Sequence, residues 1–229
     1  AAFEKLKQEG KAKKAIVVVP ASLRSNFVDN GIKRFTDSSV ATFGPKHEGG
    51  TKTVGDKSGA TYNVISYDLF REHGDKVIEG TGADTIIMDE VHRARGTEGA
   101  TYNKLRELRP KFRNAITLTG SVVNNEPNDI VPMMDLTYGP TAHKLVSKPF
   151  FDKLFVNKNA VKRGFFNPKV HVEKTLKNKE QLGKYLKGRV NFIPHQSVEA
   201  DMPKRVDHTV KVEMTPKQTD IYNLSMSSI

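Results

Sequence analysis

The sequence predicts an α/β fold with a mostly parallel central sheet. Strand-like and helix-like segments alternate over the first 140 residues, an order typical of a parallel sheet flanked by helices. Two apolar runs, Thr85–Met88 and Ala115–Leu118, lack the alternation of a half-exposed strand, which indicates strands covered on both faces. At 229 residues the chain can also bury a substantial core.

Eight segments before residue 120 carry the signals of regular structure. The helical segments have apolar residues at near-helical spacing, or begin and end at residues such as Ser22 and Gly10. The strand-like segments are apolar or β-branched runs bounded by residues that break strands. The expected helices are residues 2–9, 22–35 and 99–109, and the expected strands are residues 15–19, 40–43, 62–66, 85–88 and 115–118.

Residues 44–60 are rich in Gly, Lys and Thr, so we expect an exposed, mobile loop there. Within it, the segment Gly50–Ser58 misses the phosphate-loop pattern by one inserted residue, Asp56. It follows no apolar strand and precedes a strand rather than a helix. We therefore do not expect its amides to cradle a phosphate.

The pattern changes from about residue 140. Five phenylalanines among lysines predict a helical protrusion with a small core over residues 143–166, since Phe151 and Phe155 lie four apart on one helical face. Basic residues interleaved with aromatics can also stack on nucleic-acid bases, and this alternative stays open. Short strands are expected at residues 170–172 and 209–212, and a final helix begins at Thr215.

Composition limits the classes of partner. The formal net charge is +11, with 37 Lys and Arg against 26 Asp and Glu, which favours a polyanionic partner, although a merely basic protein is the alternative. The absence of cysteine excludes a disulfide scaffold, a thiolate metal site and a cysteine nucleophile. No apolar stretch reaches membrane-spanning length, and residues 1–14 are too polar for a signal peptide. We expect an intracellular protein, cytoplasmic or in a nucleoid, with no membrane partner.

The first apolar run ends in two adjacent carboxylates, Asp89 and Glu90, followed by His92. Functional residues of a parallel sheet gather at the carboxyl ends of its strands. One carboxylate there can hold Mg²⁺ through water while the other orients an attacking water. A solvated helix cap is the alternative. The second run ends in Thr119, Gly120 and Ser121, so we expect both strand ends at one edge of the sheet.

The order of these segments resembles that of Swi/Snf-type DNA-dependent ATPases, which belong to helicase superfamily two with the DEAH and DEAD proteins. The resemblance spans nearly the whole chain, and its specificity lies in the order and spacing of several motifs. Val17–Phe27 is similar to motif Ia, and Val64–Leu69 is similar to the family's segment before the next helix. Asp89–Ala94 is similar to the Walker B motif or DEAH box, Leu118–Ser121 is similar to motif III, and Asn124–Leu136 is similar to the segment that follows motif III. The passage toward a second lobe is matched by Met202–Lys204, by the strand that runs to Val212 and by the spacing of Gln218 and Tyr222.

The resemblance implies much of the first RecA-like lobe, a three-layer fold, of an ATP-dependent translocase. ATP and Mg²⁺ would be its cofactors, and double-stranded DNA and a second RecA-like lobe its partners. Asp89 would coordinate Mg²⁺ through water, Glu90 would be the catalytic base, and His92 would link the nucleotide to motif III. Thr119, Gly120 and Ser121 would relay the nucleotide state, although turn hydroxyls also cap helices.

The resemblance also implies a track along the DNA backbone, in which position and not base sequence is read. Its residues would be Pro20, Ser22, Leu23, Asn26, Ser66 and Tyr67. Lys52, Lys104 and Arg106, in the loop and the basic helix, are expected to add to DNA affinity.

Departures from the family matter as well. Its Gly-rich phosphate loop is not found, and residues 2–9 match the later part of the helix after that loop, so we expect the chain to begin just downstream. Without that loop and the arginine fingers of a second lobe, the chain alone should hydrolyse ATP poorly or not at all. Ser121-Val122 replaces the usual Thr-Pro, and Arg189 is all that remains of a double-arginine signature, which indicates a divergent member.

The sequence thus predicts three parts: a RecA-like lobe over residues 1–140, a helical and basic appendage over residues 141–202, and a junction over residues 203–229. Two other functions stay open. One is a strand-separating DNA or RNA helicase of the same superfamily, and the other is a non-catalytic nucleic-acid-binding module.

Overall fold

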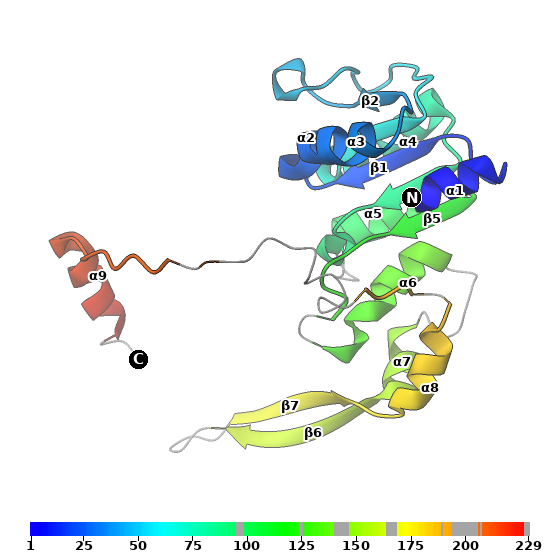
Figure 1. Ribbon diagram of the computed structural model, residues 1–229. Coiled ribbons are helices and arrows are strands. Elements are labelled where there is room, and N and C mark those ends of the chain that lie inside the picture. The colour runs from blue at the N-terminus through cyan, green and yellow to red at the C-terminus, as the bar shows by residue number, and fades with distance from the viewer. Residues whose placement is uncertain are drawn as a thin grey trace. The chain divides into compact units, whose positions relative to one another are not determined.

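The structure is a computed structural model (Figure 1). It describes residues 1–94, 99–123, 126–139, 147–163, 169–188, 190–193, 206 and 208–226. The chain divides into two compact units, Ala1–Lys184 and Tyr185–Ile229. The three-part division expected from the sequence stays a prediction.

A five-stranded sheet forms the centre of the first unit. Its spatial order is β2-β3-β1-β4-β5, and every neighbouring pair is parallel. The predicted α/β fold with a parallel sheet is therefore confirmed, and the carboxyl ends of all five strands meet at one edge. The strands are β1 (Ala15–Val19), β2 (Val40–Thr42), β3 (Tyr62–Ser66), β4 (Thr85–Met88) and β5 (Asn114–Thr117).

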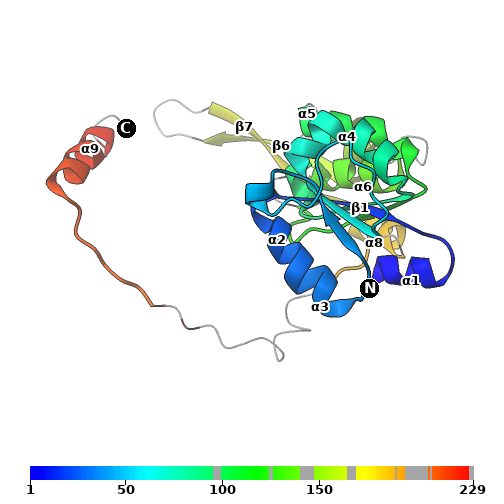
Figure 2. The same ribbon diagram turned by 90° about the horizontal axis from the view of Figure 1, so that it is seen from above.

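Helices cover both faces of this sheet (Figure 2). Helix α1 (Ala2–Gln8) and the helical run over residues 21–35 lie on one face, and α4 (Tyr67–Thr81) and α5 (Ala100–Leu108) lie on the other. The run contains α2 (Arg24–Asn26), a π-helical turn at Phe27–Ile32 and α3 (Lys33–Phe35). The helix predicted over residues 22–35 is thus confirmed, with a π-turn that the sequence did not indicate.

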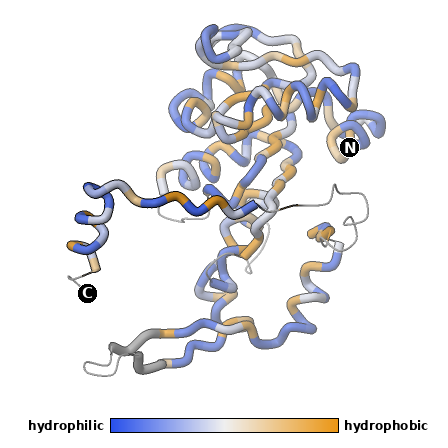
Figure 3. The backbone as a smooth tube through the Cα atoms, turned by 60° about the vertical axis from the view of Figure 1, so that its left-hand side comes forward, coloured by the Kyte–Doolittle hydropathy of each residue, from blue (hydrophilic) through white to orange (hydrophobic). Residues whose placement is uncertain are grey.

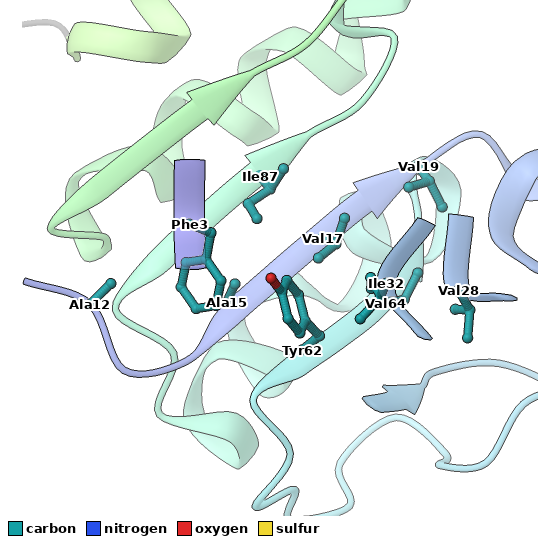
Figure 4. Close-up of a cluster of buried hydrophobic side chains, with 10 residues drawn as sticks. All are labelled: Phe3, Ala12, Ala15, Val17, Val19, Val28, Ile32, Tyr62, Val64 and Ile87. Atoms are coloured by element: carbon teal, nitrogen blue, oxygen red, sulfur yellow. The ribbon is translucent and has the colours of Figure 1, made fainter. Parts of the chain in front are cut away.

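Alternate residues of the strands build the core under α1 and α2. Figure 4 shows Val17 and Val19 of β1 on the face of the sheet that the helical run covers, where Val28 and Ile32 of the π-turn belong to the same buried cluster. The ring of Phe3 packs edge-on against Tyr62, with centroids 4.9 Å apart. Burial of each aliphatic side chain here contributes about 1.5–3 kcal/mol, which fixes the sheet as a rigid support.

The loop over residues 44–60 is largely exposed, as predicted, but it is anchored rather than free. The backbone N–H of Thr42 donates to Thr51 Oγ1 at 2.9 Å, and the N–H of Lys52 donates to the Thr42 carbonyl at 3.0 Å. Farther along, the N–H of Ser58 donates to the Gly80 carbonyl at 3.0 Å. Hydrogen bonds to β2 and α4 therefore hold this loop at its middle and near its end.

Among the described residues, three α-helices and a hairpin come next after β5, and all but the last two residues of the third helix belong to the first unit. Helix α6 (Ile130–Tyr138) packs against β5, α7 (Lys148–Phe155) follows, and α8 (Lys179–Leu186) lies after a hairpin. The predicted small core is confirmed, because Phe151 and Phe155 are buried with ring centroids 5.2 Å apart. Phe165 and Phe166 lie outside the described residues.

The helical protrusion predicted over residues 143–166 is wrong beyond Phe155. Strand β6 (Val156–Arg163) pairs antiparallel with β7 (Lys169–Leu176), so the chain forms a hairpin there. Residues 156–163 include two asparagines and two valines, which are weak helix formers, and the partner strand decides the conformation. Strand β6 is largely polar in sequence, which explains the absence of a clear strand pattern there, and Figure 3 shows the coloured part of the hairpin as largely hydrophilic. The strand predicted at residues 170–172 is confirmed within β7.

The second unit contains α9 (Pro216–Met226), which confirms the predicted final helix. Residues 209–212 were expected to form a strand, but they pair with no described strand, and Val210 and Val212 are exposed. Without a partner to take its hydrogen bonds, an apolar run does not become a strand. Asn124, Arg189 and the Met202–Lys204 segment lie outside the described residues. Among the helices that the structure describes, none has the length and apolar character that crossing a membrane requires.

Candidate functional site

The carboxyl ends of β4 and β5 lie side by side. Met88 is in register with Thr117, and the N–H of Leu118 donates to the Met88 carbonyl at 2.8 Å. The pairing continues past the strands, since the N–H of Val91 donates to the Leu118 carbonyl at 3.0 Å. The acid pair and the hydroxyl segment therefore leave the sheet at one edge, as the sequence predicted.

Glu90 turns sharply at this edge. Its φ of +51° lies in the left-handed region that non-glycine residues seldom occupy. The turn brings Glu90 Oε2 to 3.0 Å from His92 Nδ1. This distance is short enough for an ion pair, but the two groups are not oriented for a hydrogen bond. Glu90 Oε2 is buried and has no hydrogen-bond partner among the described residues. The carboxylate thus has a free acceptor inside the site.

His92 joins the acid pair to Thr119. Its Nδ1 lies 3.0 Å from Thr119 Oγ1. The hydroxyl of Thr119 also donates to the Ser121 carbonyl at 3.3 Å and accepts from the Ser121 N–H at 3.1 Å. The tautomer of His92 decides which of the two groups donates in the contact between Nδ1 and the Thr119 hydroxyl. Gly120, between the two hydroxyl residues, is exposed.

Asp89 is half-buried beside the neighbouring strands. Its backbone N–H donates to the Val18 carbonyl at 2.9 Å, and its carbonyl accepts from the Tyr67 hydroxyl at 2.7 Å. Burial, and secondarily the negative charge of Glu90, raise the pKa of the Asp89 carboxyl above its ordinary value. A cation placed here would relieve that electrostatic cost.

The donor set suits one kind of metal. Among the described residues, no three His, Cys, Asp or Glu side chains cluster as a metal cage. Mg²⁺ needs no such cage, because it keeps several waters and binds through one or two carboxylates. The acid pair, with its free buried oxygen, fits hydrated Mg²⁺.

The residues predicted to lie along DNA divide into two groups. Ser22, Leu23 and Asn26 are exposed on the helical run that begins after Pro20. Ser66 and Tyr67, in contrast, are buried.

The two buried residues have structural partners. Ser66 Oγ accepts a long hydrogen bond from the Leu69 N–H at 3.4 Å and caps α4, and Tyr67 holds the Asp89 carbonyl. The same edge opens into a pocket of about 420 Å³. Its lining residues are Pro20, Ala21, Ser22, Tyr67, Asp68, Arg93 and Thr101. Pro20 and Tyr67 therefore border the pocket, whereas Ser66 acts within the fold.

Two arginines of this region were not identified from the sequence. Arg93 lines the 420 Å³ pocket, and its place directly after His92 was the available signal. Arg24 is only 3% exposed and donates from Nη1 to the Phe43 carbonyl at 3.3 Å and from Nη2 to Glu48. No local signal marks Arg24, because its acceptors come from a loop about twenty residues away.

The cations of the basic helix α5 form ion pairs with carboxylates of the same lobe. Lys104 Nζ lies 2.8 Å from both Asp75 and Glu107, and Arg106 Nε lies 2.8 Å from the buried Asp135. These side chains were expected to contact DNA, but their charges already have carboxylate partners. Lys52 is half-buried in the anchored loop.

Similarity to known proteins covers the whole chain. A family model described as "SNF2-related domain" matches residues 1–229. "Protein CHROMATIN REMODELING 25" of Arabidopsis thaliana is 23% identical over 227 residues, which cover 94% of this chain and 24% of that protein. "DNA repair and recombination protein RAD54-like" of Drosophila mojavensis is 25% identical over 230 residues, or 94% of this chain and 28% of that protein. The chain thus spans about a quarter of the length of these curated relatives.

A solved structure shows the same fold. It is the Sulfolobus solfataricus SWI2/SNF2 ATPase core in complex with dsDNA, with a TM-score of 0.51 and 19% identity. The match covers 67% of this chain and 30% of that one. The parallel sheet and its flanking helices therefore correspond to those of a known ATPase core.

Proposed function

The chain belongs to the SNF2-related domain family, and from that premise we propose that it forms much of the first RecA-like lobe of an ATP-dependent translocase on duplex DNA. The observation that carries the proposal is the contact of His92 with Thr119 at 3.0 Å. This contact joins the acidic end of β4 to the hydroxyl end of β5. A motor needs such a link between its nucleotide site and its DNA site.

In this proposal the acid pair serves ATP hydrolysis. Asp89 would hold Mg²⁺ through water, and Glu90 would orient the attacking water and accept its proton. Bound Mg-ATP supplies the terminal phosphate that is transferred to water. The raised pKa of Asp89 and the free buried Oε2 of Glu90 support these roles, since both features favour a cation and a water at the site.

His92, Thr119, Gly120 and Ser121 form the relay. Glu90 lies 3.0 Å from His92 Nδ1, and the same nitrogen contacts Thr119. A change in the position or charge of Glu90 therefore alters the hydrogen bond between His92 and Thr119. The hydroxyl segment then carries this change toward the residues that follow β5.

The duplex partner is supported by several observations. Ser22, Leu23 and Asn26 are exposed at the same edge of the sheet as the acid pair, and Pro20 and Tyr67 border the adjoining pocket. Ser66 supports this surface as the cap of α4. The similar archaeal core was solved in complex with dsDNA, and several relatives are named as DNA repair and recombination proteins. Backbone contacts at this edge would be independent of base sequence.

ATP hydrolysis requires groups beyond those of the 229 residues. Their sequence has no Gly-Lys-Thr or Gly-Lys-Ser phosphate loop. The Gly50–Ser58 segment lies between β2 and β3, and the Thr53 N–H there donates to Asp56 at 2.8 Å, which is a tight turn and not a phosphate cradle. We expect the isolated chain to hydrolyse ATP slowly or not at all, and a second RecA-like lobe to complete the site.

The test uses the full-length protein that contains this chain. We expect Glu90→Gln to lower DNA-stimulated ATP turnover at least about a hundredfold while ATP binding persists, because the base is lost but the size of the side chain is kept. Glu79→Gln, at an exposed glutamate of α4, is the matched control and should leave turnover unchanged. Normal turnover in Glu90→Gln would refute the assignment. A full-length protein that binds duplex but never hydrolyses ATP would instead be a non-catalytic module.

A further inference from the structure

A basic pocket lies away from the edge that carries the acid pair. It is open, has a volume of about 880 Å³, and is formed by α7, the start of β6 and the residue after β7. Its four lysines and one aspartate give a net formal charge of +3 (+4 − 1). The lining residues are Lys148, Pro149, Asp152, Lys153, Val156, Asn157, Lys158 and Lys177.

Three of these lysines have free charges. Asp152 is the one acid of the pocket, and it accepts from Asn128 Nδ2 at 2.6 Å and pairs with Lys158 Nζ at 3.0 Å. Lys148, Lys153 and Lys177 have no ion-pair or hydrogen-bond partner for their ammonium groups among the described residues. This pattern contrasts with α5, whose cations are paired. The pocket therefore keeps a positive potential that a polyanion can neutralise.

The backbone that carries these three lysines is held in place by packing and hydrogen bonds. Phe151 and Phe155 anchor α7 in the core, and Ser147 caps the helix by accepting from the Phe150 N–H at 3.3 Å. Lys177 is fixed at the backbone, because its N–H donates to the Phe155 carbonyl at 2.9 Å. The backbone positions of these lysines are therefore fixed, which suits a ligand with regularly spaced charges.

The composition of the pocket identifies that ligand. No aromatic side chain lines it. Single-stranded nucleic acid usually binds by stacking its bases on aromatic rings, and protein partners usually insert aromatic anchors, so neither class suits this pocket. Lysine ammonium groups bind phosphates as point charges, and a duplex presents its phosphates without exposing its bases.

We propose that the pocket formed by Lys148, Lys153 and Lys177 binds the phosphate backbone of duplex DNA, as a second contact separate from Ser22, Leu23 and Asn26. This inference rests on the proposed function, which supplies duplex DNA as the partner. The contact is independent of base sequence, because the pocket presents cations and no group that reads base edges.

The second contact is connected to the segment after Ser121. Asn128 is fully buried, and its side chain links that segment to Asp152, which lines the pocket. Glu126 of the same segment pairs with Lys174 of β7 at 2.6 Å. DNA bound in the pocket would therefore contact elements that are hydrogen-bonded to the segment after Thr119 and Ser121.

The test measures binding of the 229-residue chain to a fluorescent duplex of about 20 base pairs by anisotropy over a range of salt concentrations. The test variant replaces the three free lysines by glutamine: Lys148→Gln, Lys153→Gln and Lys177→Gln. The control makes the same charge change at Lys5, Lys13 and Lys76, which are exposed and whose ammonium groups contact no acceptor among the described residues. We expect the test variant to bind at least about tenfold more weakly and its salt slope to fall by about 1 per lysine, and the control to change by less than about twofold.

Further outcomes separate the inference from the proposed function. Unchanged binding of the test variant, or equal losses in both variants, would overturn the second contact and leave duplex DNA as the partner. No duplex binding by the unmodified chain would overturn both. Displacement of the duplex by polyglutamate at a lower charge concentration than by unlabelled duplex would also overturn the inference, since the pocket would then suit an acidic protein. Arginine at the three positions should restore binding, which excludes a loss due to misfolding.

Discussion

At the scale of single residues, the site depends on the strained backbone of Glu90 and on the partly desolvated carboxylate of Asp89. Glu90 has a φ of +51°, which costs a non-glycine residue roughly 1–2 kcal/mol. The turn aims its carboxylate at His92. Strained and desolvated acids at one strand end are typical of catalytic positions, where geometry takes precedence over stability.

Asp89→Asn should stabilise the fold at neutral pH. The folded-state pKa of Asp89 is raised by burial and by Glu90, so the native state favours the protonated carboxyl. This favourable contribution is fully present below the unfolded pKa and is lost as pH rises through the raised folded pKa. At pH 7 the ionised carboxylate therefore costs stability, and asparagine removes that cost.

Urea unfolding at several pH values checks this expectation. The variant should have a higher free energy of unfolding than the natural chain at pH 7, and the difference should shrink as the solution is acidified toward the ordinary aspartate pKa. Asp37→Asn, at an exposed aspartate whose carboxylate has no partner among the described residues, is the comparison and should show no such trend. A difference that grows on acidification would contradict the assignment.

At the scale of elements, the loop after β2 depends on close backbone approach. Gly50 lies so near the preceding turn that an added Cβ would clash with the Gly44 carbonyl oxygen. Arg24, from the helical run, donates to the carbonyls of Phe43 and Glu48 at the base of this loop. The loop is therefore a fixed extension of the sheet edge.

Two glycines of this loop make a matched pair. Gly50→Ala should lower the free energy of unfolding by about 1–3 kcal/mol, because the backbone must shift to admit the methyl group. Gly59→Ala should be neutral or slightly stabilising, since a Cβ there meets nothing within 4 Å. Denaturant unfolding of both variants measures the difference. Equal effects would mean that the loop does not hold this conformation.

The elements also show what a sequence can and cannot predict. The strands β4 and β5 were both predicted from apolar runs without alternation, and β4 is buried along its whole length as expected. The prediction that β5 is covered on both faces is wrong, because β5 lies at the edge of the sheet and its four residues are only half-buried. Part of β7 was predicted, as the strand at residues 170–172, but β6 was not. Val156 of β6 pairs with Leu176 about twenty residues away, and its own segment is largely polar. The Arg24 contacts were missed for the same reason, because their acceptors are distant in sequence.

At the scale of the whole molecule, the net charge of +11 indicated a polyanionic partner but not where it binds. The structure separates paired from free cations: those of α5 have carboxylate partners, whereas Lys148, Lys153 and Lys177 have none among the described residues. Such pairing depends on tertiary contacts between helices. The family and the parallel sheet were predictable from motif order, while the distribution of usable charge was not.

The ends of β4 and β5 are expected to act as one unit in the working protein. A double-mutant cycle on DNA-stimulated ATP turnover of the full-length protein tests this most directly. His92→Ala and Thr119→Ala should each lower the stimulation by duplex DNA, and the double variant should fall little further, because either change breaks the same contact. If the two losses instead multiply, the two strand ends act independently and the proposed relay is wrong.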